Sequence, residues 1–343
     1  MSLRSRLKSI ARRLPVTGAY QRRIDVLRHD IESLQARAEH LSDRLHKAIH
    51  NLPDEELSNG SVRTTLLYPP GHFYSPIVDQ GDIEQRGTQI FGRDPLALPA
   101  VHLDIASQWS TFEQLAALMT DLDFAPDRAT ANARGHRYWT ENPAYGDGDA
   151  SALAAMLRLI KPQRLIELGC GYSSACTLDT RERFLGDTPH ITFVDPYPEL
   201  LNDITRGAGE RNVDVKAFTT QDVPVEWVEQ LRENAVLFID STHVTKTGSD
   251  VNRIFFELLP ALKPGAVIHL HDVFPGFEYP RAWVEEGRSW NELYLLRAFL
   301  QYNDAFEVMC FPGLLRDLDP ARHSALAPHI TNPGGACWLR KVR

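Results

Sequence analysis

Hydrophobic residues follow two different periods along the chain, a helical one near the N-terminus and a strand-like one in the C-terminal half. From Ile24 to Ala48, apolar residues recur alternately three and four positions apart, with charged residues between them. This heptad spacing is typical of a coiled coil, and the isoleucines and leucines at its seam favour a parallel dimer. A single helix folded back on its own domain is the alternative. We expect residues 19–50 to form a coiled coil that makes the protein a homo-oligomer.

Two short segments flank the heptads. Residues 1–18 are basic, because five arginines and lysines and no acid occupy the first 13 positions, and apolar residues recur there at helical spacing. Such a basic amphipathic helix can make peripheral contact with an anionic membrane or dock on a partner, and a solvated chain end is the alternative. Residues 51–62, which include Pro53 and Gly60, predict a linker.

From Asp147 onward, short apolar runs alternate with amphipathic helical patterns, which predicts an α/β domain. A long loop is expected over 273–288, and a helix is expected to start near Trp290. Residues 63–146 lack this alternation and are expected to form a cap region. The strands are expected at 165–168, 191–195, 213–218, 235–240, 266–272, 306–311 and 336–341.

The composition limits the class of protein. The net charge of −8 over 343 residues argues against a nucleic-acid binder. The four cysteines form no Cys-x-x-Cys pair, so neither a zinc knuckle nor a disulfide framework is predicted. No apolar run is long enough to cross a bilayer, and the N-terminus lacks the apolar core of a signal peptide. We expect a cytoplasmic protein, at the inner membrane face if the basic segment binds lipid.

One stretch carries a ligand-binding pattern. The apolar run Leu165–Leu168 contains Glu167 and breaks into a turn with Gly169 and Gly171. Glycines let the backbone approach a ligand, and the amides of the following helix point at it. An acid before the turn would repel the pyrophosphate of a dinucleotide and suits a cationic ligand. The pattern acid-x-Gly-x-Gly resembles motif I of the class I S-adenosylmethionine-dependent methyltransferases.

That resemblance covers about residues 147–343 and implies a doubly wound, Rossmann-like sheet of seven strands that ends in an antiparallel hairpin. It implies that Glu167 helps to hold the amino-acid end of S-adenosylmethionine and that the glycines pass under its ribose. An acid that ends the second strand, Asp195, can accept both ribose hydroxyls. Asp222 lies where the family places a polar side chain against the adenine amino group. The expected cofactor-binding residues are Glu167, Gly169, Gly171, Ser173, Asp195, Asp222 and Asp240.

Acids and histidines gather after the fourth and fifth strands, where an open α/β sheet carries its site. Methyl transfer to a hydroxyl needs alignment of the acceptor and removal of a proton. The resemblance to the catechol O-methyltransferase branch implies a divalent metal on Asp240, His271 and Asp272, with His243 as base. A histidine ligand moves the preference from magnesium toward manganese, zinc or iron.

Two other interpretations of this cluster stay open. Without a metal, His243 can be the general base, oriented by Asp240 or Asp272. His271 and Asp272 can also pair only with each other.

The sequence therefore predicts a methyltransferase that uses S-adenosylmethionine to methylate a hydroxyl of a small molecule, sugar or glycan. The motif Asn-Pro-Pro-Tyr of amino methylation is absent. A family member would keep elements that close over the acceptor in the region 63–146, so His72, Tyr74 and Tyr138 are candidate acceptor contacts. A non-catalytic, cofactor-binding scaffold and an NAD-dependent enzyme are the alternatives.

Overall fold

The computed structural model describes residues 67–205 and 211–343. The predicted basic segment, coiled coil and linker, residues 1–62, lie outside the described residues. The chain divides into two compact units, Met1–Ser75 and Pro76–Arg343. Of the first unit, residues 67–75 are described, and the rings of Tyr68, His72, Phe73 and Tyr74 pack on one another there.

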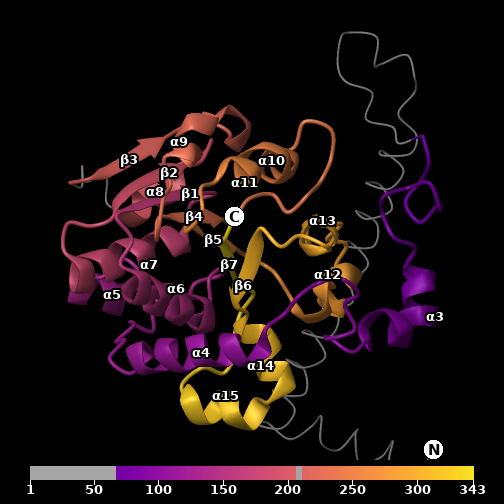
Figure 1. Ribbon diagram of the computed structural model, residues 1–343, viewed down its shortest axis with the longest axis horizontal. Coiled ribbons are helices and arrows are strands. Elements are labelled where there is room, and N and C mark those ends of the chain that lie inside the picture. Colours follow the sequence, from indigo (N-terminus) through magenta and orange to yellow (C-terminus); the bar gives the residue numbers. More distant parts are fainter. Residues whose placement is uncertain (1–66, 206–210) are drawn as a thin grey trace, which may run out of the picture. The chain divides into compact units, whose positions relative to one another are not determined.

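The second unit is built on one seven-stranded sheet (Figure 1) with the order β3-β2-β1-β4-β5-β7-β6. The five strands β1 to β5 are parallel, whereas β7 runs antiparallel to both β5 and β6. All seven predicted strands are present, with ends that differ from the predicted ones by at most two residues, and the terminal antiparallel hairpin is confirmed. The strands are β1 Arg164–Leu168, β2 His190–Val194, β3 Val213–Lys216, β4 Val236–Ile239, β5 Val267–Leu270, β6 Phe306–Cys310 and β7 Cys337–Lys341.

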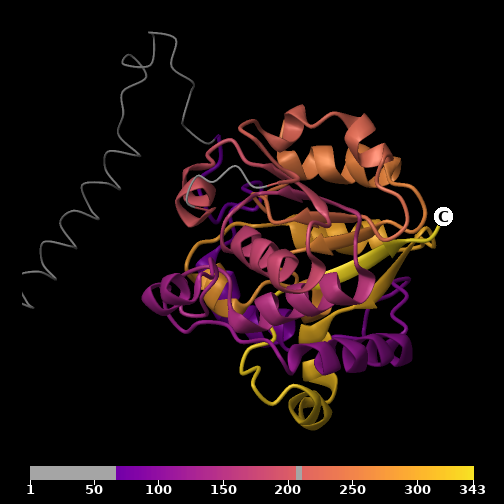
Figure 2. The same cartoon turned by 90° about the vertical axis from the view of Figure 1, so that its left-hand side faces the viewer.

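Helices cover both faces of this sheet, as a doubly wound fold requires (Figures 1 and 2). One core contains Leu165 and Phe238 from the sheet and the buried faces of α4 Ile105–Met119, α6 Asp147–Ile160, α7 Tyr172–Thr180 and α8 Glu199–Thr205. The core on the other face contains Ile166 and Leu237. It is closed by α9 Val225–Glu229, the helical run α10 Asp250–Arg253, η3 Ile254–Leu258 and α11 Leu259–Ala261, and α13 Glu292–Leu300. The central strands are buried on both faces, which is why they are continuous apolar runs in the sequence.

The segment before β1 contains helices and turns but no strand among its described residues. Asp79 caps α3 Gln80–Phe91, Asp104 caps α4, and Asp127 caps α5 Arg128–Arg134, each by accepting a backbone N–H of the first turn. The remaining short elements are η1 Arg181–Leu185, η2 Thr220–Asp222, η4 Pro275–Phe277, α12 Arg281–Glu285, α14 Pro312–Leu318 and α15 Pro320–Leu326.

The predicted long loop over 273–288 is wrong in part. The turn η4 and the helix α12 lie within it. Pro280 is the N-cap of α12, and a five-residue helix is too short to show a helical period in the sequence. None of the helices in the described part of the chain is long and apolar enough to span a membrane.

The sheet brings the predicted site together at one edge. Leu168, Ile239 and Leu270 are neighbours in register on β1, β4 and β5. The residues that follow them, Gly169 and Asp240 first, therefore leave the sheet side by side. This is the carboxyl edge of the parallel strands, where ligands bind in open α/β sheets.

Candidate functional site

The turn after β1 is held against β4. Gly169 has a left-handed backbone, with φ of +83°, and a Cβ there would lie 1.7 Å from the backbone oxygen of Asp240. Only glycine fits such a position. Gly171 is different, because its φ of 179° is ordinary extended backbone and the nearest atom to an added Cβ is Leu200 Cδ2 at 3.5 Å. Packing therefore requires Gly169, and only a ligand would require Gly171.

Glu167 is fully buried beneath this turn. Its Oε1 accepts hydrogen bonds from the hydroxyls of Ser173 and Ser174, each at 2.7 Å. Its Oε2 has no hydrogen-bond partner among the described residues. Burial raises the pKa of Glu167 to about 8, against the opposing effect of the two serine hydroxyls. An unpartnered, buried carboxylate oxygen is costly and indicates a site for a donor or a cation.

Asp195 follows β2 and holds the loops around a cavity of about 330 Å³. Its Oδ2 accepts the backbone N–H of Cys170 at 2.9 Å, and its Oδ1 accepts that of Tyr197 at 2.7 Å. The cavity is lined by Gly169, Asp195, Pro196, Tyr197, Thr219, Thr220, Gln221, Asp240, Ser241, Thr242 and Asp250.

Asp222 does not line this cavity in the described structure. It is exposed, and its carboxylate accepts the hydroxyl of Thr219 at 2.7 Å. Its neighbour Gln221 lines the cavity instead, with its amide bonded to the backbone oxygen of Gly248.

A second cavity, of about 560 Å³, lies on the other side of Asp240 and Ser241, which line both. Its floor contains Asp149, His243, His271 and Asp272, and aromatic side chains form part of its wall. The two cavities thus meet at the end of β4. This arrangement suits the transfer of a group between two bound molecules.

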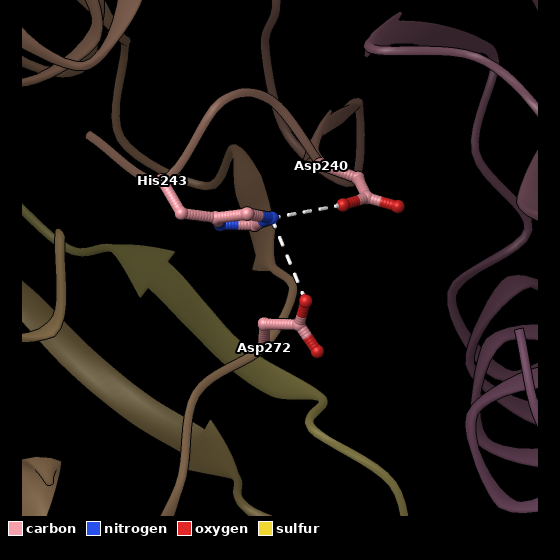
Figure 3. A group of neighbouring side chains, drawn as sticks. All are labelled: Asp240, His243 and Asp272. Atoms are coloured by element: carbon pink, nitrogen blue, oxygen red, sulfur yellow. Dashed lines mark ion pairs between the residues drawn. The ribbon is translucent and has the colours of Figure 1, made fainter. Parts of the chain in front are cut away.

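His243 lines the second cavity, and its ring points toward two aspartates (Figure 3). Its Nε2 lies 3.3 Å from Oδ1 of Asp240 and 3.5 Å from Oδ2 of Asp272. Its Nδ1 lies 2.8 Å from Oε2 of Glu292, which fixes the ring from the opposite side. His243 and Asp272 both have left-handed φ values, 58° and 55°. Residues other than glycine with such strained backbone angles are found preferentially at functional sites.

The charges around His243 decide its proton affinity. Burial alone would lower the pKa of His243, but the hydrogen bonds to Asp240 and Glu292 outweigh it and raise the pKa to about 10. In return, His271 and His243 hold the pKa of Asp240 below its usual value despite burial. A cation that neutralised Asp240 or Asp272 would lower the pKa of His243 again.

His271 lies beside the triad of Asp240, His243 and Asp272 but makes longer contacts. Its Nε2 is 3.7 Å from Oδ1 of Asp272, and its Nδ1 is 3.9 Å from Oδ1 of Asp149. The ligand atoms that could meet on one metal ion belong to Asp240, His243 and Asp272, within 4.8 Å of one another. The structure therefore groups His243, rather than the predicted His271, with the two aspartates.

The three candidate acceptor contacts have other partners among the described residues. Tyr138 is 1% exposed, and its hydroxyl donates to the backbone oxygen of Tyr145 at 2.8 Å, so it is a core residue. His72 and Tyr74 belong to the unit that ends at Ser75, where the backbone N–H of Tyr74 donates to Nδ1 of His72.

Sequence reasoning missed two acids of the site. Glu292 stands at the start of α13, where an acid is common for electrostatic reasons alone. Asp149 stands in the first turn of α6, with Oδ1 accepting the backbone N–H of Gly335 at 2.9 Å, and burial raises its pKa to about 6. The sequence also did not indicate the turn at Gly334 and Gly335. This turn packs directly on Asp149, because a Cβ on Gly334 would lie 2.1 Å from the Asp149 carboxyl.

Part of this sheet is similar in sequence to a known protein family. The segment 166–273, from β1 to just past β5, matches the family model described as a methyltransferase domain. Residues 166–273 form a methyltransferase domain. The seven-stranded sheet around this segment has the strand order and the antiparallel end that were expected of a Rossmann-like methyltransferase fold.

Other proteins resemble the methyltransferase domain more distantly. An uncharacterized protein of Archaeoglobus fulgidus is 29% identical over 172 residues, which are 50% of this chain and 76% of that protein. The crystal structure of a Podospora anserina methyltransferase with bound S-adenosylhomocysteine is 18% identical, with a TM-score of 0.41, over 68% of this chain and 96% of that one. The O-methyltransferase TomG of Streptomyces achromogenes, with S-adenosylmethionine, is 13% identical, with a TM-score of 0.40, over 77% and 97%. Likenesses this distant say nothing of the acceptor.

Proposed function

We propose that the protein is an S-adenosylmethionine-dependent methyltransferase that methylates a hydroxyl group of a small molecule, sugar or glycan. The observation that carries this proposal is the position of His243. Its Nε2 faces the carboxylates of Asp240 and Asp272 at the junction of the two cavities, and Glu292 holds its Nδ1. S-adenosylmethionine, when bound, supplies a methyl group already activated on a sulfonium.

The first cavity has residues that fit this cofactor. The unpartnered Oε2 of Glu167 suits its cationic amino group, and the open backbone at Gly171 suits a close approach to the chain. Asp195 keeps lone pairs free on both carboxylate oxygens after accepting one N–H on each, so it can also accept hydroxyls. Gln221 and Thr220 line the far part of the same cavity.

His243 is the proposed proton acceptor in the second cavity. With Nδ1–H donated to Glu292, the lone pair of the neutral ring is on Nε2, which faces the cavity. The negative charge of Glu292 stabilises the imidazolium that forms when the acceptor hydroxyl gives up its proton. Asp240 and Asp272 add to that stabilisation and can also accept hydrogen bonds from the acceptor.

A metal-assisted reaction is the second candidate, and a specific observation favours it. One imidazole nitrogen and two carboxylates lie within 4.8 Å of one another, and the other ring nitrogen is held by a carboxylate. A metal-binding histidine usually donates its other ring N–H to a carboxylate in this way. Asp240, His243 and Asp272 would hold a divalent cation, with manganese, zinc or iron preferred over magnesium, and the cation would acidify the hydroxyl.

Calorimetry tests the proposed function. Binding of S-adenosylmethionine and S-adenosylhomocysteine is measured on the full chain and on Asp195→Ala. Binding of nicotinamide dinucleotide is measured in the same way, to test the alternative of an NAD-dependent enzyme. We expect micromolar dissociation constants, about −8 kcal/mol, that are lost in the variant. If neither compound binds, the proposal is wrong. If both bind but His243→Ala retains its biological activity, the scaffold interpretation replaces it.

We also propose that the heptads of residues 19–50 make the protein a homo-oligomer and that residues 1–18 bring it to an anionic membrane surface. The first proposal rests on the heptad spacing and the second on the basic residues, both read from the sequence. Light scattering of the full chain and of Leu34→Asp tests the oligomer. Flotation with anionic vesicles tests the membrane contact. An unchanged molar mass in the variant, or no flotation, contradicts the respective proposal.

A further inference from the structure

Three aromatic side chains form one wall of the second cavity. Phe274, Trp283 and Trp290 pack edge to face, with ring centroids 5.0 Å apart for the first pair and 5.4 Å for the second. The ring of Trp290 also lies 4.5 Å from that of His243. A molecule that offers a hydroxyl to His243 therefore contacts this wall.

Arg288 stands at the rim of that wall. Its guanidinium carbon is 4.1 Å from the ring centroid of Trp283 and 5.2 Å from that of Trp290. Among the described residues, its Nε donates to Glu286 at 3.0 Å, and neither terminal nitrogen has a hydrogen-bond partner. The two indoles thus orient a guanidinium whose terminal N–H groups remain available. These groups recognise carboxylates and phosphates in bidentate fashion.

The charged side chains that line the second cavity are mostly acidic, and Arg288 is an exception. The floor of the second cavity carries three acids, Asp149, Asp240 and Asp272, which outnumber its two histidines, His243 and His271. Arg288 is the one arginine or lysine that lines this cavity in the described part of the chain. An acceptor with its anionic group toward the floor would be repelled. An acceptor with a hydroxyl toward the floor and an anionic group toward the rim meets an opposite charge at each end.

Arg288 and Trp290 also line a third cavity, of about 300 Å³, beside α3 and α13. Its lining is mainly apolar and includes Val78, Ile83 and Phe91. It contains a second arginine, Arg93, and one acid, Glu278, whose carboxylate already accepts the hydroxyl of Tyr294. Arg288 thus lines both a polar cavity at His243 and a mainly apolar cavity.

We propose that the acceptor is an anionic molecule in three parts. A hydroxyl-bearing ring or chain occupies the second cavity, a carboxylate or phosphate binds Arg288, and an apolar or aromatic substituent occupies the third cavity. Arg288 is then the residue that selects anionic acceptors. This inference rests on the proposed function and names the class of acceptor for it.

Matched pairs of probes test the inference by calorimetry on the full chain saturated with S-adenosylhomocysteine. The carboxylate arm compares para-nitrophenyl β-D-glucuronide with para-nitrophenyl β-D-glucoside, which differ in the acid group alone. The phosphate arm compares a glucose monophosphate with glucose. We expect the acid to bind about tenfold tighter or more in at least one arm, as a charge-assisted bidentate contact gives.

Two variants complete the test. Arg288→Met keeps an apolar stem beside the indoles and removes the charge, so the acid should bind no better than its neutral partner. Arg281→Met is the control, because Arg281 belongs to α12 and pairs with Glu285 but lines neither cavity. It should leave the preference unchanged.

The contrary outcomes are distinct. Equal binding within both pairs, no binding of any acidic probe, or a preference that persists in Arg288→Met overturns the inference while binding of S-adenosylhomocysteine still supports the proposed function. Failure to bind S-adenosylhomocysteine at all removes the proposed function, and the acceptor inference falls with it.

Discussion

Glu292 holds Nδ1 of His243 at 2.8 Å across a separation of 49 residues in the chain. The contact is tied down by the backbone, because the N–H groups of Asn291 and Glu292 both donate to the carbonyl oxygen of His243. The start of α13 therefore positions the loop after β4 as a unit. When the proton is on Nδ1, the lone pair of the neutral ring is on Nε2, beside Asp240 and Asp272.

Replacing Glu292 by glutamine should reduce methyl transfer by roughly ten- to a hundredfold, because the amide keeps the shape but loses the charge that stabilises the imidazolium. The effect should fall on kcat more than on KM. Steady-state kinetics measures it, and Glu285→Gln, an exposed acid of α12, is the control. Unchanged kcat would show that Glu292 has only a structural role.

The pH dependence should follow His243. Its pKa of about 10 makes the neutral imidazole the minor form at pH 7, and that fraction grows as the pH rises. If His243 is the base, the rate should rise with pH up to the pKa of His243 in the loaded enzyme. Replacing Asp272 by asparagine removes a carboxylate that faces His243, so the rising limb should move to lower pH. The same limb in both proteins would exclude His243 as the base.

Substitutions at the two glycines of the loop should have different effects, one on stability and the other on ligand affinity. Gly169→Ala meets both a left-handed backbone, worth about 1–2 kcal/mol, and a clash with Asp240, so it should lower the melting temperature strongly. Gly171→Ala has room for its methyl group and should fold normally, but should lose affinity for S-adenosylhomocysteine. Thermal unfolding and calorimetry separate the two effects. Full affinity in Gly171→Ala would mean that no ligand approaches this backbone.

Cofactor binding should release a proton from Glu167. Its pKa of about 8 means that most molecules carry it protonated at pH 7, and a bound amino group beside Oε2 favours the ionised form. Affinity for S-adenosylhomocysteine should therefore increase with pH up to about 8 and then level off. Calorimetry in buffers of different ionisation enthalpy counts the proton directly. Glu167→Gln should bind without this pH dependence.

A chelator distinguishes the two proposed roles of the triad. With His243 as the base, prolonged dialysis against a chelator should leave kcat within about twofold, since no step depends on a cation. A loss that manganese or zinc restores, and that magnesium does not, would assign Asp240, His243 and Asp272 to a metal. Asp240→Asn, which removes a carboxylate used in either role, serves as the reference for reduced activity.

The sheet was predictable because buried parallel strands leave continuous apolar runs, and His243 was a candidate because an acid and a histidine follow its strand. Glu292 was not, since its role depends on a tertiary contact that no local pattern encodes. Asp149 was missed for the same reason. Tyr138 was expected near the acceptor, yet its hydroxyl bonds to the backbone of Tyr145 in the core. Composition alone cannot tell which aromatic residue of a segment faces inward.

Asp240 and Ser241 line both the first cavity, proposed for the cofactor, and the second, proposed for the acceptor. Two ligands that share a wall are thermodynamically coupled, so that each changes the affinity for the other by the same factor. A substitution at Asp240 therefore cannot be assigned to one ligand from a single titration. Four dissociation constants are needed, one for each ligand in the absence and in the presence of the other. The coupling free energy from these constants measures how much binding at one cavity changes the affinity at the other.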